Sequence, residues 1–405
     1  MFVMCNNIIK YFIWLVLSLF YSYQIIHRIL TTIINDYLVL KYSMDADQIG
    51  QFAGMWYLGY VIMHIPIGIF LDHFSVKKVI SFCILLTVVG FLPLLYSNNL
   101  LLLMCGRFLI GAGCAASTLG AFKLLILFFG RDKFPLMLGA MVSVGLVFGA
   151  LSAQPISILM VKFGWELVFR LLLYCGLFLG LFFYSVIPNT KAHTEFSFYL
   201  VLSNFKYVIS KPVIIIISVL AGLMIGPLEG FSDSWSIKYL MDVYHFSQYL
   251  SLNINKMMLI GMAVGLLILG KVFARFNSYY FLIIASGFFM LIIFLLIIMK
   301  FTYRLWLIMI LFFIIGLFCS YQMIVIAKGI SLVNIRYGTF VSAIMNMIMM
   351  GCGYLFHRVI GKILKYSHNL NGIYQENDYL YAFSPIIIGL IIAIIGFIYC
   401  KLKKI

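Results

Sequence analysis

The sequence has few charged residues. Only 10% of its 405 residues are charged, whereas 64% are hydrophobic and 17% are aromatic. A soluble domain cannot bury that much apolar surface in one core, so we expect lipid to surround much of the chain. Apolar runs of about 20 residues, the length of one membrane-spanning helix, recur from one end of the sequence to the other. These runs do not alternate as barrel strands do, which predicts an all-α integral membrane protein.

Paired cysteines and catalytic motifs are also missing. The eight cysteines lie singly, with no C-x-x-C pair, so we expect free thiols, no bound metal and no cofactor. "GLLILGK", residues 265–271, begins like a phosphate-binding loop, but Val272 stands where Ser or Thr would bind Mg²⁺. An H-x-x-x-x-D pair, a paired-aspartate metal motif and a sizeable soluble loop are absent too. These absences argue against a membrane-embedded transferase, the alternative from another functional class, and we expect no enzyme activity.

Breaks in hydropathy predict twelve spans. Gly, Pro and charged residues interrupt the apolar runs, and the longest polar connection separates six spans from six. We expect an N-terminal bundle at residues 1–187, a linker at 188–211 and a C-terminal bundle at 212–405. The predicted spans cover residues 11–36, 49–71, 78–97, 101–129, 134–161, 165–187, 212–238, 252–274, 279–299, 302–327, 337–361 and 379–400.

The distribution of Lys and Arg predicts the orientation. If the N-terminus is cytoplasmic, most of these residues, among them Lys77, Lys78 and Lys401, fall in the inner loops, as the positive-inside rule requires. We expect a multi-pass protein of the inner or plasma membrane with both termini in the cytoplasm. The net charge of +16 is then mainly a topology signal and an attraction to anionic lipid headgroups, so no nucleic-acid partner is expected.

One polar stretch interrupts the apolar sequence between the second and third predicted spans. In "GIFLDHFSVKKVI", residues 68–80, the positions of Gly68, Asp72, Lys77 and Lys78 resemble the signature of the major facilitator superfamily in this link. That signature has Arg and Gly where this chain has His73 and Ser75. Physically, Gly68 would allow two helices to approach closely, and Asp72 would complement a positive helix end. The resemblance implies that this gating motif latches the two halves together in one transport state.

Further motifs carry the same resemblance along the chain. "GRFLIGAGCAAS" in the fourth span and "GALSAQP" in the fifth are similar to patterns of that family. Gly106, Gly113 and Gly120 recur every seven residues, which predicts a small-residue seam for close helix packing. "GKVFARF", residues 270–276, lies about 200 residues after Gly68 and is a decayed second copy of the gating motif. Repeated halves with a site at their interface are typical of secondary transporters, and the resemblance implies two pseudo-symmetric six-helix halves.

Ionisable residues inside predicted spans are candidates for function because they cost free energy in lipid. Arg28 and Glu229 are about 200 residues apart, so the repeat predicts similar depths on equivalent helices. Glu229 and Asp233 are four residues apart and share one helix face in "IGPLEGFSDSW". Two neighbouring buried carboxylates raise each other's proton affinity, which makes them candidates for proton coupling. The alternative is a static salt bridge with Arg28.

Cations on the spans that line the cavity in this family suggest the charge of the substrate. Arg28, Arg107 and Lys123 outnumber the two acids, which favours an anionic or zwitterionic solute. Arg107 and Lys123 lie sixteen residues apart, roughly 160° and about 24 Å on a straight helix, so they do not face the same point. Further candidate substrate-binding residues are Gln24, Gln154, Tyr321 and Gln322.

Together these patterns predict a secondary active transporter that works by alternating access. We expect proton-coupled symport of a small organic anion or zwitterion, with the solute, protons and the lipid bilayer as partners and no obligate protein partner. "YSYQIIHR" and "FKLL" resemble a branch of the superfamily that includes dipeptide and organic-anion carriers. The alternative within this fold is a drug or metabolite exporter, which would favour an electronegative or apolar cavity.

Overall fold

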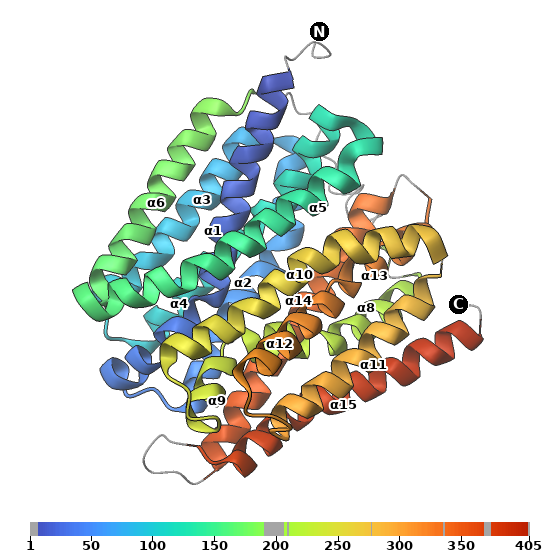
Figure 1. The fold of residues 1–405 in the computed structure, drawn as a ribbon. Helices are drawn as coiled ribbons and strands as arrows, with labels where there is room; N and C mark the ends of the chain where they lie inside the picture. Colours follow the sequence, from blue (N-terminus) through green and yellow to red (C-terminus); the bar gives the residue numbers. More distant parts are fainter. Residues whose placement is uncertain are drawn as a thin grey trace.

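The protein is a bundle of long helices (Figure 1). The computed structural model describes residues 7–189, 206–208, 210–276, 278–334, 337–367 and 374–403, and these residues contain no β-strand. Most of the predicted linker, residues 188–211, lies outside the described residues. The helices are α1 (Asn7–Tyr42), α2 (Ala46–His73), α3 (Val76–Tyr96), α4 (Leu100–Cys114), α5 (Ala116–Phe163), α6 (Trp165–Val186), α8 (Pro212–Met224), η1 (Gly226–Ser232), α9 (Ser236–Asp242), α10 (Gln248–Phe276), α11 (Tyr279–Ile298), α12 (Leu305–Cys319), α13 (Tyr321–Ser331), α14 (Gly338–Tyr366) and α15 (Glu376–Leu402).

The described helices confirm the twelve predicted spans. Eleven stretches are long and apolar enough to cross a membrane, and the bent pair of α8 and η1 makes a twelfth. Leu100–Gly130 is one span built from α4 and the first part of α5, and Gly130 ends it with a φ of 76°. That left-handed conformation favours glycine, and it allows the chain to turn into the next span, Leu136–Phe163. Because the number of spans is even, the start of α1 and the end of α15 lie on one side of the bundle, here called the terminal face.

Glycines bring α3 and α4 into backbone contact. A Cβ on Gly113 would lie 2.2 Å from the carbonyl oxygen of Cys83, and one on Gly106 would lie 2.5 Å from that of Gly90. A Cβ on Gly120, in the next helix, would lie 2.2 Å from the side chain of Ile80. All three glycines therefore face α3, which confirms the predicted small-residue seam.

Helices from before and after residues 190–205 meet along three lines. α2 packs against α14, α5 against α10, and α1 against α9; Figure 1 shows α5 and α10 side by side across the middle of the molecule. The contact of α2 with α14 is closest on the face opposite the termini. There a Cβ on Gly50 would lie 2.3 Å from the carbonyl oxygen of His357, and one on Gly361 would lie 2.5 Å from that of Ala46.

Two ion pairs accompany this backbone contact. Asp45 lies 2.9 Å from Lys365, and Asp47 lies 3.6 Å from Arg358. Asp45 also caps α2, since its carboxylate accepts a hydrogen bond from the backbone N–H of Gln48. The first turn of α2 and the last turns of α14 are thus closed together on the face opposite the termini. We call this contact the non-terminal gate.

The gating motif lies at the other end of α2. A Cβ on Gly68 would meet no atom within 4 Å, so the prediction that Gly68 allows a close helix approach is wrong for this conformation. Lys77 lies over the ring of Tyr184 at 4.4 Å, and Lys78 lines an apolar pocket between α2 and α3. The side chain of Asp72 lies outside the described part of the chain, as do those of residues 273–276 in the second copy of the motif.

Two glycine substitutions test the packing of α3 against α4. Gly113→Ala should lower the thermal unfolding temperature of the purified protein, because its methyl group must displace the backbone of α3 at a cost of about 1–3 kcal/mol. Gly139→Ala is the matched control, since a Cβ there meets nothing within 4 Å. Alanine favours a helix over glycine by about 1 kcal/mol, so the control should leave the unfolding temperature unchanged or raise it. Equal shifts in the two variants would contradict the seam.

Candidate functional site

The seventh span is broken where the sequence reads "GPLEGFS". α8 ends at Met224, and the following π-helix η1 is bent from it by 47°. Pro227 cannot donate a backbone hydrogen bond and the two glycines of this stretch lack side chains, so the segment holds an α-helix poorly. The wider turn is visible where the N–H of Asp233 donates to the carbonyl of Leu228 at 3.2 Å. η1 carries Glu229, and Asp233 follows its last residue.

The side chain of Arg28 on α1 meets both of these acids. Its Nε lies 3.0 Å from Oδ2 of Asp233, and its Nη1 lies 3.7 Å from Oε1 of Glu229. The exposed fractions are 6% for Arg28, 0% for Glu229 and 1% for Asp233, so all three groups are removed from solvent. The structure therefore brings together the three ionisable residues that the repeat and the helix spacing had related.

Two uncharged side chains complete this buried cluster. The hydroxyl of Tyr57 on α2 donates to Oδ2 of Asp233 at 2.5 Å. The amide of Gln322 on α13 donates to Oε1 of Glu229 at 3.2 Å. The cluster therefore joins α1 and α2 from the first half of the sequence to η1 and α13 from the second. We call Arg28, Tyr57, Glu229, Asp233 and Gln322 the central cluster.

The cluster has more negative than positive charge. One guanidinium faces two carboxylates, which leaves one negative charge in excess when both acids are ionised. An uncompensated charge in a dry interior costs several kcal/mol, whereas a protonated acid or a bound cation removes that cost. The cluster can therefore take up a proton or a positively charged group.

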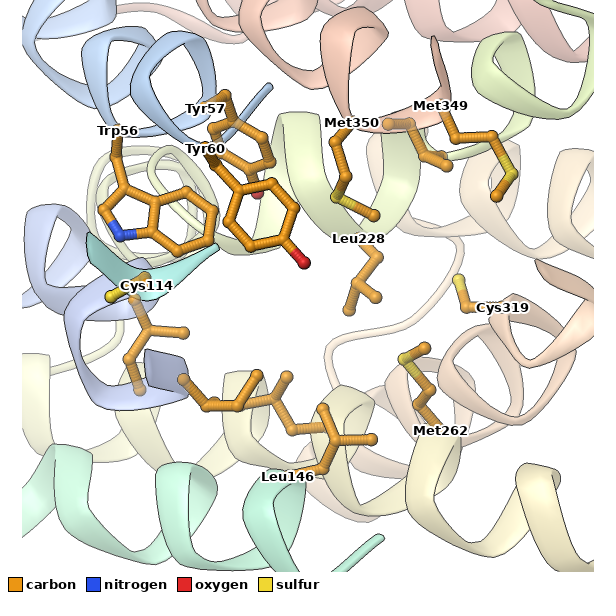
Figure 2. Close-up of a cluster of buried hydrophobic side chains, with 14 of the residues drawn as sticks. Trp56, Tyr57, Tyr60, Cys114, Leu146, Leu228, Met262, Cys319, Met349 and Met350 are labelled. Atoms are coloured by element: carbon orange, nitrogen blue, oxygen red, sulfur yellow. The ribbon is translucent and has the colours of Figure 1, made fainter. Parts of the chain in front are cut away.

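Apolar and sulfur-containing side chains form a buried group near the central cluster. Figure 2 shows these side chains converging from α2, α4, α5, η1, α10, α12 and α14. The hydroxyl of Tyr60 points toward the middle of this group, and the indole of Trp56 stacks on the ring of Tyr60 with centroids 5.2 Å apart. The side chains labelled there are Trp56, Tyr57, Tyr60, Cys114, Leu146, Leu228, Met262, Cys319, Met349 and Met350. Such a wall suits the apolar part of a small organic molecule, because methionine and aromatic side chains adapt to irregular shapes.

Arg107 and Lys123 do not join the central cluster. The guanidinium of Arg107 donates to the carbonyls of His27 and Arg28 at 2.8 and 3.4 Å and to the hydroxyl of Thr31 at 2.8 Å. It therefore ties its helix to the backbone of α1. The ammonium of Lys123 donates to the carbonyl of Leu71 at the end of α2, beside the gating motif. Among the described residues Arg28 alone reaches the two acids, whereas Arg107 and Lys123, which the helix spacing predicts to face different points, donate to backbone carbonyls of α1 and α2.

The remaining predicted substrate residues lie in different places. Gln322 belongs to the central cluster, whereas the hydroxyl of Tyr321 donates to the carbonyl of Ala221 at 2.6 Å. Gln24 is buried and accepts a hydrogen bond from Ser117. Gln154 is partly exposed on α5. Of these four residues, only Gln322 joins the charged residues of the central cluster.

Sequence reasoning missed Tyr57, and the structure places a further polar contact between α2 and α14 at His64. The Nδ1 of His64 lies 3.1 Å from the carbonyl oxygen of Tyr60, and since a carbonyl only accepts, Nδ1 carries the proton. Nε2 of His64 then accepts from the amide of Asn346 on α14 at 3.3 Å. Tyr57 looks in the sequence like an ordinary member of an apolar helix. No spacing rule pairs it with an acid 176 residues away.

No metal site accompanies these groups: the described ranges contain no group of three or more His, Cys, Asp or Glu residues placed to hold a metal ion. The cysteines there are free, as predicted.

Comparisons with known proteins agree on one fold. The family model described as the Major Facilitator Superfamily matches residues 4–357. No curated protein matches the chain. Among solved structures, a bacterial homologue of the human lysosomal transporter Spinster, in an inward-facing and unoccupied conformation, has a TM-score of 0.74 at 16% identity over 97% of each chain. The nucleoside transporter NupG has a TM-score of 0.74 at 15% identity over 96% of this chain and 98% of its own. A D-xylose–proton symporter has a TM-score of 0.73 at 11% identity over 95% and 97%.

Replacing Arg107 tests its role as a tie between helices. Arg107→Gln should lower the thermal unfolding temperature by several degrees, because charged hydrogen bonds to buried oxygens are worth about 1.5–3 kcal/mol each. Arg170→Gln is the matched control: Arg170 pairs with Glu166 at 3.3 Å, but the two side chains are 50% and 56% exposed. Loss of such a surface pair costs at most about 1 kcal/mol. Similar unfolding temperatures for the two variants would show that Arg107 does not hold α1 in place.

Proposed function

Because the chain belongs to the Major Facilitator Superfamily, we propose that it moves a small anionic or zwitterionic organic solute across the membrane by alternating access, as a proton-coupled symporter. Membership in this family makes it a multi-pass membrane transporter and not an enzyme. The observation that carries the proposal is the central cluster, where a buried guanidinium meets two buried carboxylates between the two halves of the chain.

The cluster offers both parts of a binding site for an amphoteric solute. The guanidinium of Arg28 matches a carboxylate in shape and charge. The carboxylate in excess can hold either a proton or an ammonium group, so the cluster suits an organic anion that binds together with a proton, or a zwitterion such as an amino acid or short peptide. The sulfur-rich and aromatic wall in Figure 2 would hold its side chain. Arg28, Gln322 and the wall are the proposed substrate site.

Glu229 and Asp233 are the proposed proton site. When both are ionised they compete with a solute carboxylate for Arg28, and when one is protonated that competition weakens. Proton binding and solute binding then favour each other, which is the linkage that a symporter requires. A gradient of protons can therefore drive accumulation of the solute.

The two halves are the proposed moving units, with boundaries at residues 1–187, 188–211 and 212–405. We assign the present conformation to the state open toward the terminal face, since the non-terminal gate is closed by backbone contact and two ion pairs. With cytoplasmic termini this is the inward-facing state of a protein of the inner or plasma membrane. Asp72, Lys77 and Lys78 are proposed to latch the opposite end in the outward-facing state, with Lys123 beside them.

An exporter of apolar or cationic compounds is the second candidate. Two observations favour it: the wall of Figure 2 is largely apolar, and the described part of the central cluster has one cation for two acids. In such an exporter the acids would bind the cation and the proton in turn. The two candidates differ in the ligand that Arg28 recognises.

A thermal-shift screen with two variants tests the proposal. Amino acids, dipeptides, dicarboxylates and apolar amines are offered to the purified wild type, to Arg28→Gln and to Arg170→Gln as the surface control. We expect carboxylate-bearing compounds to stabilise the wild type and the control. Binding by Arg28→Gln should be at least about tenfold weaker, since about 1.4 kcal/mol corresponds to tenfold and a charged hydrogen bond is worth at least that much. Stabilisation by apolar amines alone, unchanged in Arg28→Gln, would favour the exporter.

A bulky residue in the non-terminal gate tests alternating access. Gly361→Val cannot close against Ala46, so the open form of this face should gain population. The reporter is a single cysteine at position 51 of α2, in a background without native cysteines, labelled with an impermeant maleimide added to the non-terminal side. We expect faster labelling in Gly361→Val. The matched control is Gly351→Val on the same helix, where a Cβ meets nothing within 4 Å, and its labelling should equal that of the parent. Equal rates in both variants would contradict the gate.

A further inference from the structure

The two acids of the central cluster are not equivalent. Oδ2 of Asp233 receives a hydroxyl hydrogen bond at 2.5 Å from Tyr57 and lies 3.0 Å from the Nε of Arg28. Oε1 of Glu229 receives an amide hydrogen bond at 3.2 Å from Gln322 and lies 3.7 Å from the Nη1 of Arg28. Asp233 therefore has both the shorter hydrogen bond and the closer cation. Each of these stabilises an ionised carboxylate more strongly at short distance.

We propose that Asp233 is the permanently ionised anchor of Arg28, that Tyr57 is the positioning residue that keeps it so, and that Glu229 is the acid that takes and returns the proton. Neutralising the excess charge needs one proton, and the carboxylate with the weaker donors is the one that accepts it. Each acid has one buried oxygen without a hydrogen-bond partner among the described residues, Oε2 of Glu229 and Oδ1 of Asp233, so the choice between them rests on the donors at the other oxygen, which are weaker at Glu229. The proton comes from water on one side of the membrane and leaves to water on the other, and no covalent bond to the solute forms.

Other titratable groups near Glu229 do not change which of the two acids accepts the proton. Cys319 and Tyr321 flank it, but the hydroxyl of Tyr321 is committed to the carbonyl of Ala221. α14 contributes His357, which lies against the ring of Tyr57 with centroids 5.2 Å apart. The groups that face Glu229 are thus Tyr21 and Arg28 on α1, Tyr57 on α2, Asp233, and Cys319 and Tyr321. Arg28 is the only cation in this set.

The two acids contact different edges of the Arg28 guanidinium. Its Nε edge is held by Asp233, whereas Nη1 has only the distant Glu229 and Nη2 is buried with no hydrogen-bond partner in the described chain. Protonation of Glu229 would leave the Nη edge to a solute carboxylate. This last step rests on the proposed function, but the assignment of the proton to Glu229 does not.

Carbodiimide labelling tests the assignment without any knowledge of the substrate. Dicyclohexylcarbodiimide is apolar and reacts with protonated carboxyl groups in membranes, and peptide mass spectrometry identifies the residue modified. At neutral pH we expect label on Glu229 and little on Asp233. Tyr57→Phe removes the hydroxyl that serves Asp233, so labelling of Asp233 should rise several-fold. Tyr239→Phe on α9 is the matched control, because the hydroxyl of Tyr239 donates to the carbonyls of Ile297 and Ile298 and contacts neither acid. It should leave the pattern unchanged.

An infrared measurement keeps the test decisive if the reagent fails to reach the cluster. The carbonyl stretch of a protonated carboxyl should be present in the wild type. Protein made with glutamate that carries carbon-13 in its side-chain carboxyl should show this band shifted, whereas carbon-13 in the aspartate side chains should leave it in place. Predominant label on Asp233, a band that shifts only with labelled aspartate, or no band at all would overturn the assignment, as would an unchanged pattern in Tyr57→Phe. If Glu229 carries the proton as expected but the thermal-shift screen finds no carboxylate-bearing ligand, the proposed function fails and the assignment stands.

Discussion

The structure depends on one buried cation. Arg28 is the group through which α1 contacts the broken seventh span, and its removal from solvent is tolerable only because two carboxylates and a neighbouring phenol surround it. Arg107 contributes at one remove: by holding the carbonyls of His27 and Arg28 it fixes the turn of α1 from which the guanidinium extends. The fourth span thus supports the first, and the first engages the seventh. Two arginines that look alike in the sequence thus have different partners: Arg28 pairs with carboxylates, whereas Arg107 donates to backbone carbonyls.

The sequence predicted the features that depend on local pattern. Hydropathy located all twelve spans because the length of a membrane helix is set by the bilayer. The seven-residue glycine spacing placed Gly106, Gly113 and Gly120 against α3 because helix periodicity fixes which residues share a face. The internal repeat related Arg28 to Glu229 because equivalent helices of two halves lie at equivalent depths.

The features that the sequence could not supply depend on long-range packing. Counting cations placed Arg107 and Lys123 in the site, but a count does not show whether a charge binds a solute or a carbonyl oxygen. Gly68 has open space around it here, and the pattern of its own helix does not show which neighbour it meets. Tyr57 reaches Asp233 across 176 residues of sequence, and nothing in the composition of its own helix marks it.

The π-helix makes the winding of the seventh span as important as the chemical groups that the span carries. A turn that closes over five residues instead of four holds one residue more than an α-helical turn, and each residue of an α-helix advances the chain by about 100°. If the segment from Gly226 to Ser232 kept all its residues but closed as an α-helix, the extra residue would no longer be absorbed in the wider turn, and everything after it would rotate by about that angle relative to α8. Asp233 would then point away from Arg28 while every chemical group of the cluster was still present. A change that straightens this segment is therefore a change of register, which no compensating substitution at the acids can repair.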